Sequence, residues 1–202
     1  MATATTPPRP PVFNLPNQLT ASRLVLALIL FLLIDLQLWI SCIGIFALAA
    51  ATDWLDGYLA RKQGLVSTLG RNLDPLVDKV LVCGAYIFLL PISGAGLAPW
   101  MVTVVVAREL IITGLRSFME NRGATFGADW LGKIKMFLQC GALFAIFIAL
   151  KALELEPESA SLWTTLRDLF VGAMLLATAL SGLQYLWRAA MLLKTDTASG
   201  EA

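Results

Sequence analysis

Four aspartates within 26 residues are the side chains of this sequence best placed to do chemistry. Asp53 and Asp56 are three residues apart, and Asp74 and Asp78 are four residues apart. On a helix, each of these spacings puts both carboxylates on one face. Four carboxylates gathered where apolar helices meet the boundary of a membrane repel one another. They are also costly to desolvate unless cations neutralise them. The spacing therefore predicts a shared cation site on two consecutive helices.

The type of ligand indicates which cation binds there. The chain has no histidine, and carboxylate oxygens alone suit hard ions such as Mg²⁺ or Mn²⁺. Two such ions can hold a diphosphate and stabilise both the attacking oxygen of the acceptor and the leaving oxygen. The alternative is a solvated helix-end cluster that pairs with Arg61, Arg71 and Lys79. That alternative does not explain the small residues Gly57 and Ala60, which let a ligand or a neighbouring helix approach the backbone.

The spacing resembles the signature of the CDP-alcohol phosphatidyltransferase family at eight positions: Asp53, Asp56, Gly57, Ala60, Arg61, Gly70, Asp74 and Asp78. The resemblance implies transfer of a phosphatidyl group from a CDP-linked lipid to an alcohol, with release of CMP. It also implies that the four aspartates bind two Mg²⁺ or Mn²⁺ ions and that Asp78 is the general base. The residues implied in binding CDP-diacylglycerol are Asn17, Gly57, Arg61, Ser67 and Gly70.

The stretch "NLPNQLTASRL" also resembles this family. Asn17 and Thr20 are residue types that cap helices, so they either cap the first helix or, in the case of Asn17, contact the nucleotide. Similarly, the sequence Asp74-Pro75 predicts a helix start, because proline is tolerated in the first turn and aspartate is favoured beside the positive end of a helix.

A second group of charged residues predicts the acceptor. Arg108 and Glu109 lie inside an apolar run, where a purely structural ion pair is an expensive choice. With Arg116, Lys133 and Lys135 they predict a positive pocket for an acceptor that carries its own phosphate. For the two lysines, the alternative is ordinary cationic flanking of a membrane span.

The stretches "ARE" and "GKIK" resemble those of family members that use sn-glycerol 3-phosphate, which gives phosphatidylglycerophosphate and CMP. Met136 departs from that pattern, because threonine often follows the second lysine. Inositol phosphate, serine and phosphatidylglycerol are therefore the alternative acceptors.

The composition predicts the elements that must position these residues. Of the 202 residues, 58% are hydrophobic and 14% are charged, against about 25% charged in a soluble domain. Cys42, Cys83 and Cys140 lie in apolar runs and are expected to be small core residues. We predict an all-α integral membrane protein with six transmembrane helices, at 18–38, 39–61, 73–92, 97–119, 131–151 and 162–187. Residues 1–15 are predicted to be a disordered extension, 16–192 the membrane domain and 193–202 a cytoplasmic tail.

Lysine and arginine gather in alternate loops, which by the positive-inside rule puts both termini and the aspartates on the cytoplasmic side. The other side holds mainly Lys151 and Arg167 beside three glutamates. We expect the protein in the inner membrane, in contact with membrane lipid, with no nucleic-acid partner. The family resemblance suggests a homodimer.

Two other classes of protein place charge inside a membrane. A transporter commonly has duplicated halves, but the aspartate pattern has no second copy in the later spans. A membrane prenyltransferase also binds diphosphate through aspartates and Mg²⁺, but six spans are too few for one. Release of CMP from labelled CDP-diacylglycerol distinguishes the transferase from both.

Overall fold

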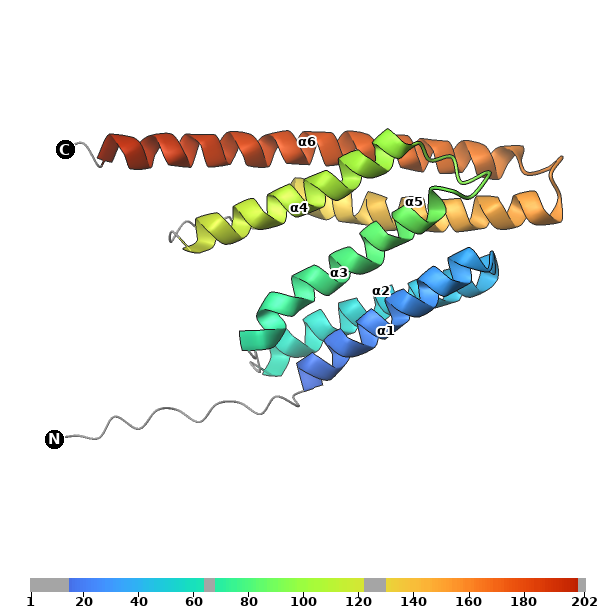
Figure 1. The fold of residues 1–202 in the computed structure, drawn as a ribbon, viewed down its shortest axis with the longest axis horizontal. Coiled ribbons are helices and arrows are strands. Elements are labelled where there is room, and N and C mark those ends of the chain that lie inside the picture. The colour runs from blue at the N-terminus through green and yellow to red at the C-terminus, as the bar shows by residue number, and fades with distance from the viewer. Residues whose placement is uncertain (1–14, 64–67, 122–129, 200–202) are drawn as a thin grey trace.

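The computed structural model describes residues 15–63, 68–121 and 130–199, with side chains for 21–52, 77, 79–119 and 130–191. These residues form six helices and no strand: α1 (Leu15–Asp35), α2 (Trp39–Gln63), α3 (Thr68–Leu89), α4 (Pro99–Asn121), α5 (Trp130–Leu155) and α6 (Ser161–Ser199). Consecutive helices run in opposite directions, so α2, α4 and α6 end where α3 and α5 begin (Figure 1). The all-helical prediction is confirmed for this part of the chain.

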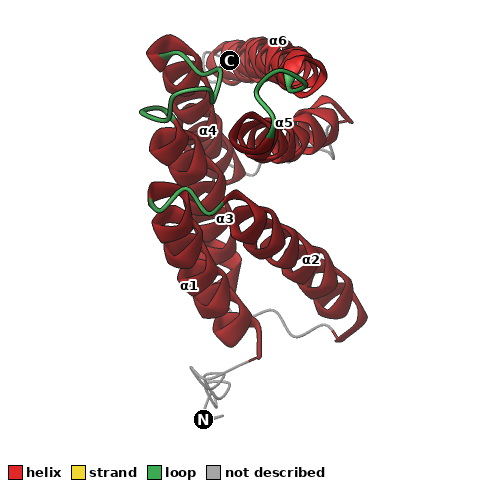
Figure 2. Ribbon diagram, turned by 90° about the vertical axis from the view of Figure 1, so that its right-hand side faces the viewer, coloured by secondary structure: helices red, strands yellow, loops and turns green. Residues whose placement is uncertain are grey.

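The helices pack as two groups that share a core. α1 packs against α2 and α3, while α6 packs against α4 and α5 (Figure 2). The groups meet where α2 contacts α5 and where α3 contacts α4 and α5. Phe46 of α2 is buried there, with its ring edge-on to Phe144 and Phe147 of α5 at centroid distances of 4.9 and 6.2 Å. This contact joins α2 to α5, while α3 contacts both α4 and α5.

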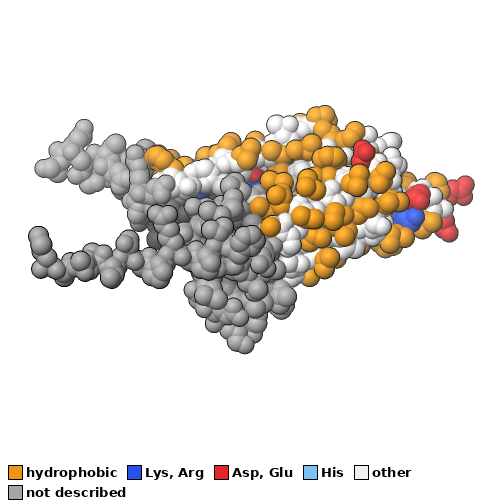
Figure 3. Space-filling model, turned by 60° about the horizontal axis from the view of Figure 1, so that its bottom comes forward, with side chains coloured by type: hydrophobic (Ala, Val, Ile, Leu, Met, Phe, Trp, Pro, Cys, Tyr) orange, Lys and Arg blue, Asp and Glu red, His pale blue; other side chains and the backbone are white. Residues whose placement is uncertain are grey.

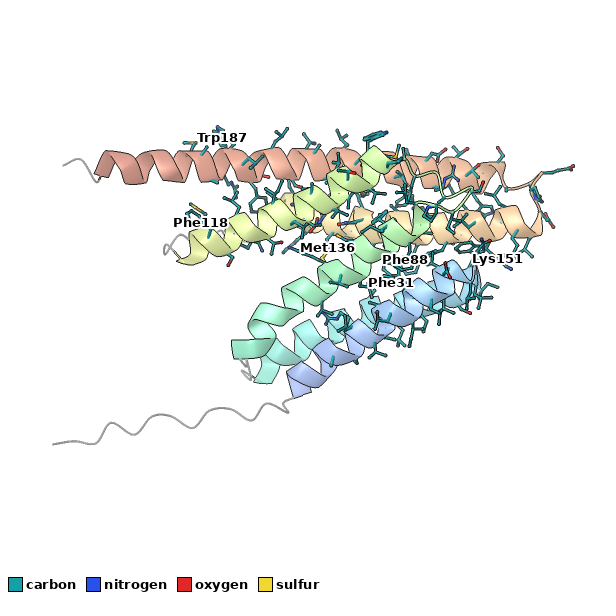
Figure 4. The ribbon with its side chains drawn as sticks, viewed as in Figure 1. Phe31, Phe88, Phe118, Met136, Lys151 and Trp187 are labelled. Carbon is teal, nitrogen blue, oxygen red and sulfur yellow. The ribbon has the colours of Figure 1, made fainter. Side chains whose placement is uncertain are left out.

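A glycine allows α1 and α3 to approach closely. The rings of Phe31 and Phe88 stack with centroids 4.8 Å apart and planes 7° from parallel (Figure 4). A Cβ atom at Gly84 of α3 would lie 2.2 Å from Cζ of Phe31. The Phe31 ring therefore occupies the space that any larger residue at position 84 would need.

Hydrophobic side chains are spread over the described part of the surface that Figure 3 shows. Leu28 and Phe137, for example, are 60% and 74% exposed. Among the described residues, Trp130–Leu155 and Ser161–Met191 are each long and apolar enough to cross a membrane. These features support a membrane protein. The finer prediction of six transmembrane spans is not tested by them and stays a prediction. Cys42 and Cys83 are buried and Cys140 is partly buried, as expected of core residues.

Several helix boundaries differ from the predicted ones, and three of the differences affect the interpretation of the sequence. α1 begins at Leu15, so Asn17 and Thr20 lie in its first two turns and do not precede it. α3 begins at Thr68, so Asp74 and Pro75 lie inside the helix and do not start it. Membrane helices tolerate proline because neighbouring groups satisfy the backbone that it frees. α6 has 39 residues, or about 58 Å at 1.5 Å per residue, and so extends past the predicted boundary at residue 187.

Arg167 holds the connection between α3 and α4. This connection lies at the opposite end of the bundle from the point where α2 ends and α3 begins. Gly94 and Gly96 have positive φ angles of 87° and 71°, which glycine adopts without strain. Arg167 of α6 donates a hydrogen bond to the Gly94 carbonyl and pairs with Asp168 at 2.8 Å. Lys151 lies at the same end (Figure 4) and pairs with Glu154 at 3.0 Å.

Candidate active site

The four predicted metal ligands divide between two helices. Asp53 and Asp56 lie one turn apart in α2, and Asp74 and Asp78 lie one turn apart in α3. The end of α2 and the start of α3 lie at the same end of the bundle (Figure 1). An oxygen-only donor set on two consecutive helices fits a divalent cation. The four side chains lie outside the described residues, so the metal site stays a prediction.

The residues predicted to bind CDP-diacylglycerol follow the same helices. Asn17 falls in α1, Gly57 and Arg61 fall in α2, and Gly70 falls in α3. Ser67 lies outside the described residues, as do the side chains of Asn17 and Arg61. Their contacts with the nucleotide therefore also stay predictions.

Glu109 of α4 is the centre of a buried group of charged side chains. Its Oε1 accepts a hydrogen bond from Nζ of Lys135 in α5 and another, at 3.1 Å, from Nη1 of Arg108. Nζ of Lys79 in α3 lies 4.0 Å from Glu109 Oε2 and donates a 3.4 Å hydrogen bond to the Glu109 main-chain carbonyl. The side chains of Glu109 and Lys135 are each 7% exposed. We call Lys79, Arg108, Glu109 and Lys135 the cation cluster.

The cation cluster carries excess positive charge in a place with little water. Three cations surround one carboxylate, which leaves two positive charges. Buried charges are expensive unless they are paired. A phosphate monoester has a charge between about −1.5 and −2 at neutral pH, so such a group would balance the cluster. The arrangement is therefore suited to binding a phosphate dianion.

α6 closes the other side of this site. Arg108 Nη2 donates a 3.0 Å hydrogen bond to Oγ of Ser181, and its guanidinium carbon lies 5.9 Å from the centre of the Tyr185 ring. Arg116 donates a hydrogen bond to the Tyr185 hydroxyl and lies 5.5 Å from the same ring centre. Two arginines of α4 thus share a single aromatic side chain of α6.

The structure places three of the four predicted acceptor residues together. Arg108 and Lys135 both contact Glu109, and Arg116 joins them through Tyr185. Lys133 is exposed, because two residues before Lys135 is a different face of α5. The role of these residues in binding an acceptor stays a prediction.

Three residues of the site were not predicted as such. Lys79 directly follows Asp78. Its position within an apolar helix was the one feature of the sequence that could have indicated a role in the site. Ser181 and Tyr185 are polar residues one turn apart in the apolar α6, so they share a face. The sequence does not say that this face meets α4, because helix pairing depends on packing throughout the bundle.

The described residues form a helical bundle with apolar, membrane-capable helices and a buried cation cluster from α3, α4 and α5, with α6 packed against it. The chain belongs to the CDP-alcohol phosphatidyltransferase family, whose model matches residues 13–181. Members of this family generally use divalent metal ions, which fits the oxygen donors of the four aspartates.

Three relatives share one curated name, CDP-diacylglycerol–glycerol-3-phosphate 3-phosphatidyltransferase. The relative from Bacillus subtilis (strain 168) is 34% identical over 92% of this chain and 100% of its own length. The one from Pseudomonas fluorescens is 34% identical over 91% of this chain and 93% of its own length. The one from Pectobacterium atrosepticum is 37% identical over 66% of this chain and 76% of its own length.

Proposed function

We propose that this protein transfers the phosphatidyl group of CDP-diacylglycerol to sn-glycerol 3-phosphate, giving phosphatidylglycerophosphate and CMP. Family membership and the name shared by the relatives support the donor and the acceptor. The observation that supports the choice of acceptor is the cation cluster, in which three cations surround one carboxylate among the described side chains. Serine has no phosphate, and the phosphate of phosphatidylglycerol is a diester with a single negative charge. Inositol phosphate carries the same kind of monoester, so the choice between it and glycerol 3-phosphate rests on the name that the relatives share.

In this proposal, Asp53, Asp56, Asp74 and Asp78 hold two Mg²⁺ or Mn²⁺ ions. The ions, when bound, neutralise the diphosphate of the donor. Asn17, Gly57, Arg61, Ser67 and Gly70 bind the CDP-diacylglycerol. A guanidinium such as that of Arg61 is a planar donor suited to phosphate oxygens.

The reaction is a single displacement at phosphorus. The free primary hydroxyl of glycerol 3-phosphate attacks the β-phosphorus, which carries the diacylglycerol, and the bond from that phosphorus to the CMP oxygen breaks. Asp78 takes the proton of the attacking hydroxyl as general base. Arg108, Arg116 and Lys135 hold the acceptor's own phosphate, which orients the hydroxyl. With no histidine in the chain, a carboxylate is the natural base.

All six helices span the inner membrane in this proposal, with both termini and the site facing the cytoplasm, and two chains form a homodimer. The arrangement of lysine and arginine supports this orientation. Single cysteines placed at 61–72 and 116–135 should be protected from a membrane-impermeant thiol reagent in sealed cells, and cysteines at 152–160 should be labelled. The reverse pattern would contradict the orientation.

The deciding experiment is an assay of the purified protein with CDP-diacylglycerol and a panel of acceptors. The panel contains glycerol 3-phosphate, inositol phosphate, serine and phosphatidylglycerol. We expect CMP release and a lipid product with glycerol 3-phosphate. A faster reaction with another member of the panel would overturn the acceptor assignment and leave the transferase assignment intact. No CMP release with any acceptor would overturn both.

A further inference from the structure

We propose that Tyr185 is a positioning residue that holds Arg108 and Arg116 at a fixed separation for the phosphate of the acceptor. This inference rests on the proposed function, because it needs the two arginines to bind that phosphate. It adds α6 to the acceptor site, although α6 contributes no residue to the aspartate pattern.

Tyr185 contacts both arginines through different parts of its side chain. Its hydroxyl accepts a hydrogen bond from Arg116, and the guanidinium carbons of Arg108 and Arg116 lie 5.9 and 5.5 Å from its ring centre. These separations are within the range of cation–π attraction, about 6 Å. Tyr185 is only 2% exposed and the Arg108 side chain is 12% exposed, so their attraction acts with little competition from water, whereas Arg116 is exposed. Two like charges that would otherwise repel are thereby held on one side chain.

The stem of Arg108 is also fixed by α6. Ser181, one turn before Tyr185, accepts a hydrogen bond from Arg108 at 3.0 Å. A Cβ at Gly182 would lie 3.4 Å from Cγ of Arg108, so the arginine stem runs along the α6 backbone. Arg108 Nε is buried and has no hydrogen-bond partner among the described residues. The guanidinium is held through its two terminal nitrogens, which leaves its Nε–H to donate to an anion.

Fixing the arginines before the substrate arrives favours binding. A free arginine side chain loses rotamer entropy when it is immobilised, and preorganisation removes that cost from the binding step. Tyr185 contributes no charge of its own, so it leaves the positive charge of the site available. The expected consequence is a lower KM for a phosphorylated acceptor and no effect on the CDP-lipid.

The test is steady-state kinetics in both substrates for Tyr185→Phe, which removes the hydroxyl and keeps the ring. We expect the KM for glycerol 3-phosphate to rise about tenfold, the effect of losing a hydrogen bond to a charged group. The KM for CDP-diacylglycerol should not change. Tyr185→Leu removes the ring as well and should raise the acceptor KM further. If Tyr185→Leu does not fold, Tyr185→Phe alone decides.

A double-mutant cycle shows whether Tyr185 acts through Arg116. In an Arg116→Ala background, Tyr185→Phe should raise the acceptor KM little further, because the hydroxyl has lost the group that it positions. Independent, additive effects of the two substitutions would overturn the proposal. So would an unchanged acceptor KM in Tyr185→Phe.

Tyr86→Phe is the matched control. Tyr86 is also buried, and its hydroxyl donates a 2.9 Å hydrogen bond to the Gln139 carbonyl, away from the arginines. Tyr86→Phe should leave both KM values unchanged. If it raises the acceptor KM as much as Tyr185→Phe does, the effect of Tyr185→Phe is merely structural. If Arg108→Ala and Arg116→Ala themselves leave the acceptor KM unchanged, the proposed acceptor site is wrong. If they raise it and Tyr185→Phe does not, only the role of Tyr185 is wrong.

Discussion

Replacing Glu109 by glutamine removes the single carboxylate of the cation cluster at nearly constant volume. Glutamine keeps one carbonyl oxygen for a hydrogen bond, so the change is electrostatic and creates no cavity. The cations then left without a counter-charge are Lys79, Arg108 and Lys135, whose Nζ and Nη atoms lie within 4.0 Å of the carboxylate in the native protein.

The magnitude follows from the burial of this group. At an effective dielectric constant of 20, a pair of unit charges 4 Å apart interacts by about 4 kcal/mol. Breaking a buried pair by removing one partner typically costs about 3–5 kcal/mol, because the other charge stays buried. We therefore expect Glu109→Gln to lower the free energy of unfolding by about 3–5 kcal/mol. At about 2–4 °C per kcal/mol for a chain of this size, the Tm should fall by roughly 10 °C.

The direction in which Glu109→Gln changes the acceptor KM tests the role of Glu109 a second time. Loss of the carboxylate raises the net charge of the cluster by one, which alone would tighten phosphate binding. It also releases Lys135 and Arg108, which repel each other and lose their common anchor. We expect the second effect to win because the geometry depends on Glu109, so the acceptor KM should rise about tenfold.

The assays are thermal unfolding in detergent and kinetics in both substrates. Glu154→Gln is the matched control, because Glu154 makes an ion pair with Lys151 but is 52% exposed. Exposed pairs contribute about 0–1 kcal/mol, so its Tm should scarcely change. An unchanged Tm together with a lower acceptor KM in Glu109→Gln would refute the view that Glu109 holds the cations in place.

Three further predictions concern the metal, the base and the packing. Activity should vanish in EDTA and return with Mg²⁺ or Mn²⁺, and full turnover in chelator would exclude a metal-dependent reaction. Asp78→Asn should abolish turnover but retain binding of CDP-diacylglycerol, measured directly; loss of that binding would show that Asp78 acts mainly in holding the donor. Gly84→Ala should lower the free energy of unfolding by about 1–3 kcal/mol through overpacking, because the new methyl group meets the Phe31 ring. An unchanged Tm would mean that Phe31 moves aside freely.

The helices could be predicted from the sequence, but several of their ends could not. Apolar runs report which residues prefer lipid, and each of the six runs lies largely within an observed helix. Hydropathy does not report where backbone hydrogen bonding stops. α6 therefore continues to Ser199 after its apolar run has ended, and α3 begins before Asp74 although proline often marks a helix start.

The acceptor site could be predicted only in part. Arg108 and Lys135 were identifiable because a charge within an apolar run needs a partner or a ligand. Lys133 could not be separated from Lys135 by composition, and only the face of α5 distinguishes them. Ser181 and Tyr185 carry no charge, so nothing in their local sequence indicates that two arginines of α4 lie against them.

The difference between the two sites has a physical origin in the chain itself. The aspartates belong to one stretch of 26 residues, so their spacing is visible in the sequence before any packing is known. The cation cluster and Tyr185 come from four helices and exist only when α3, α4, α5 and α6 are packed together. Asp78 belongs to the predicted metal site and Lys79 to the cation cluster. They are consecutive residues of α3 and so only about 1.5 Å apart along its axis. In the proposed function, a substrate phosphate at the cation cluster would therefore lie at about the depth of Asp78 along α3, as attack by the acceptor hydroxyl requires.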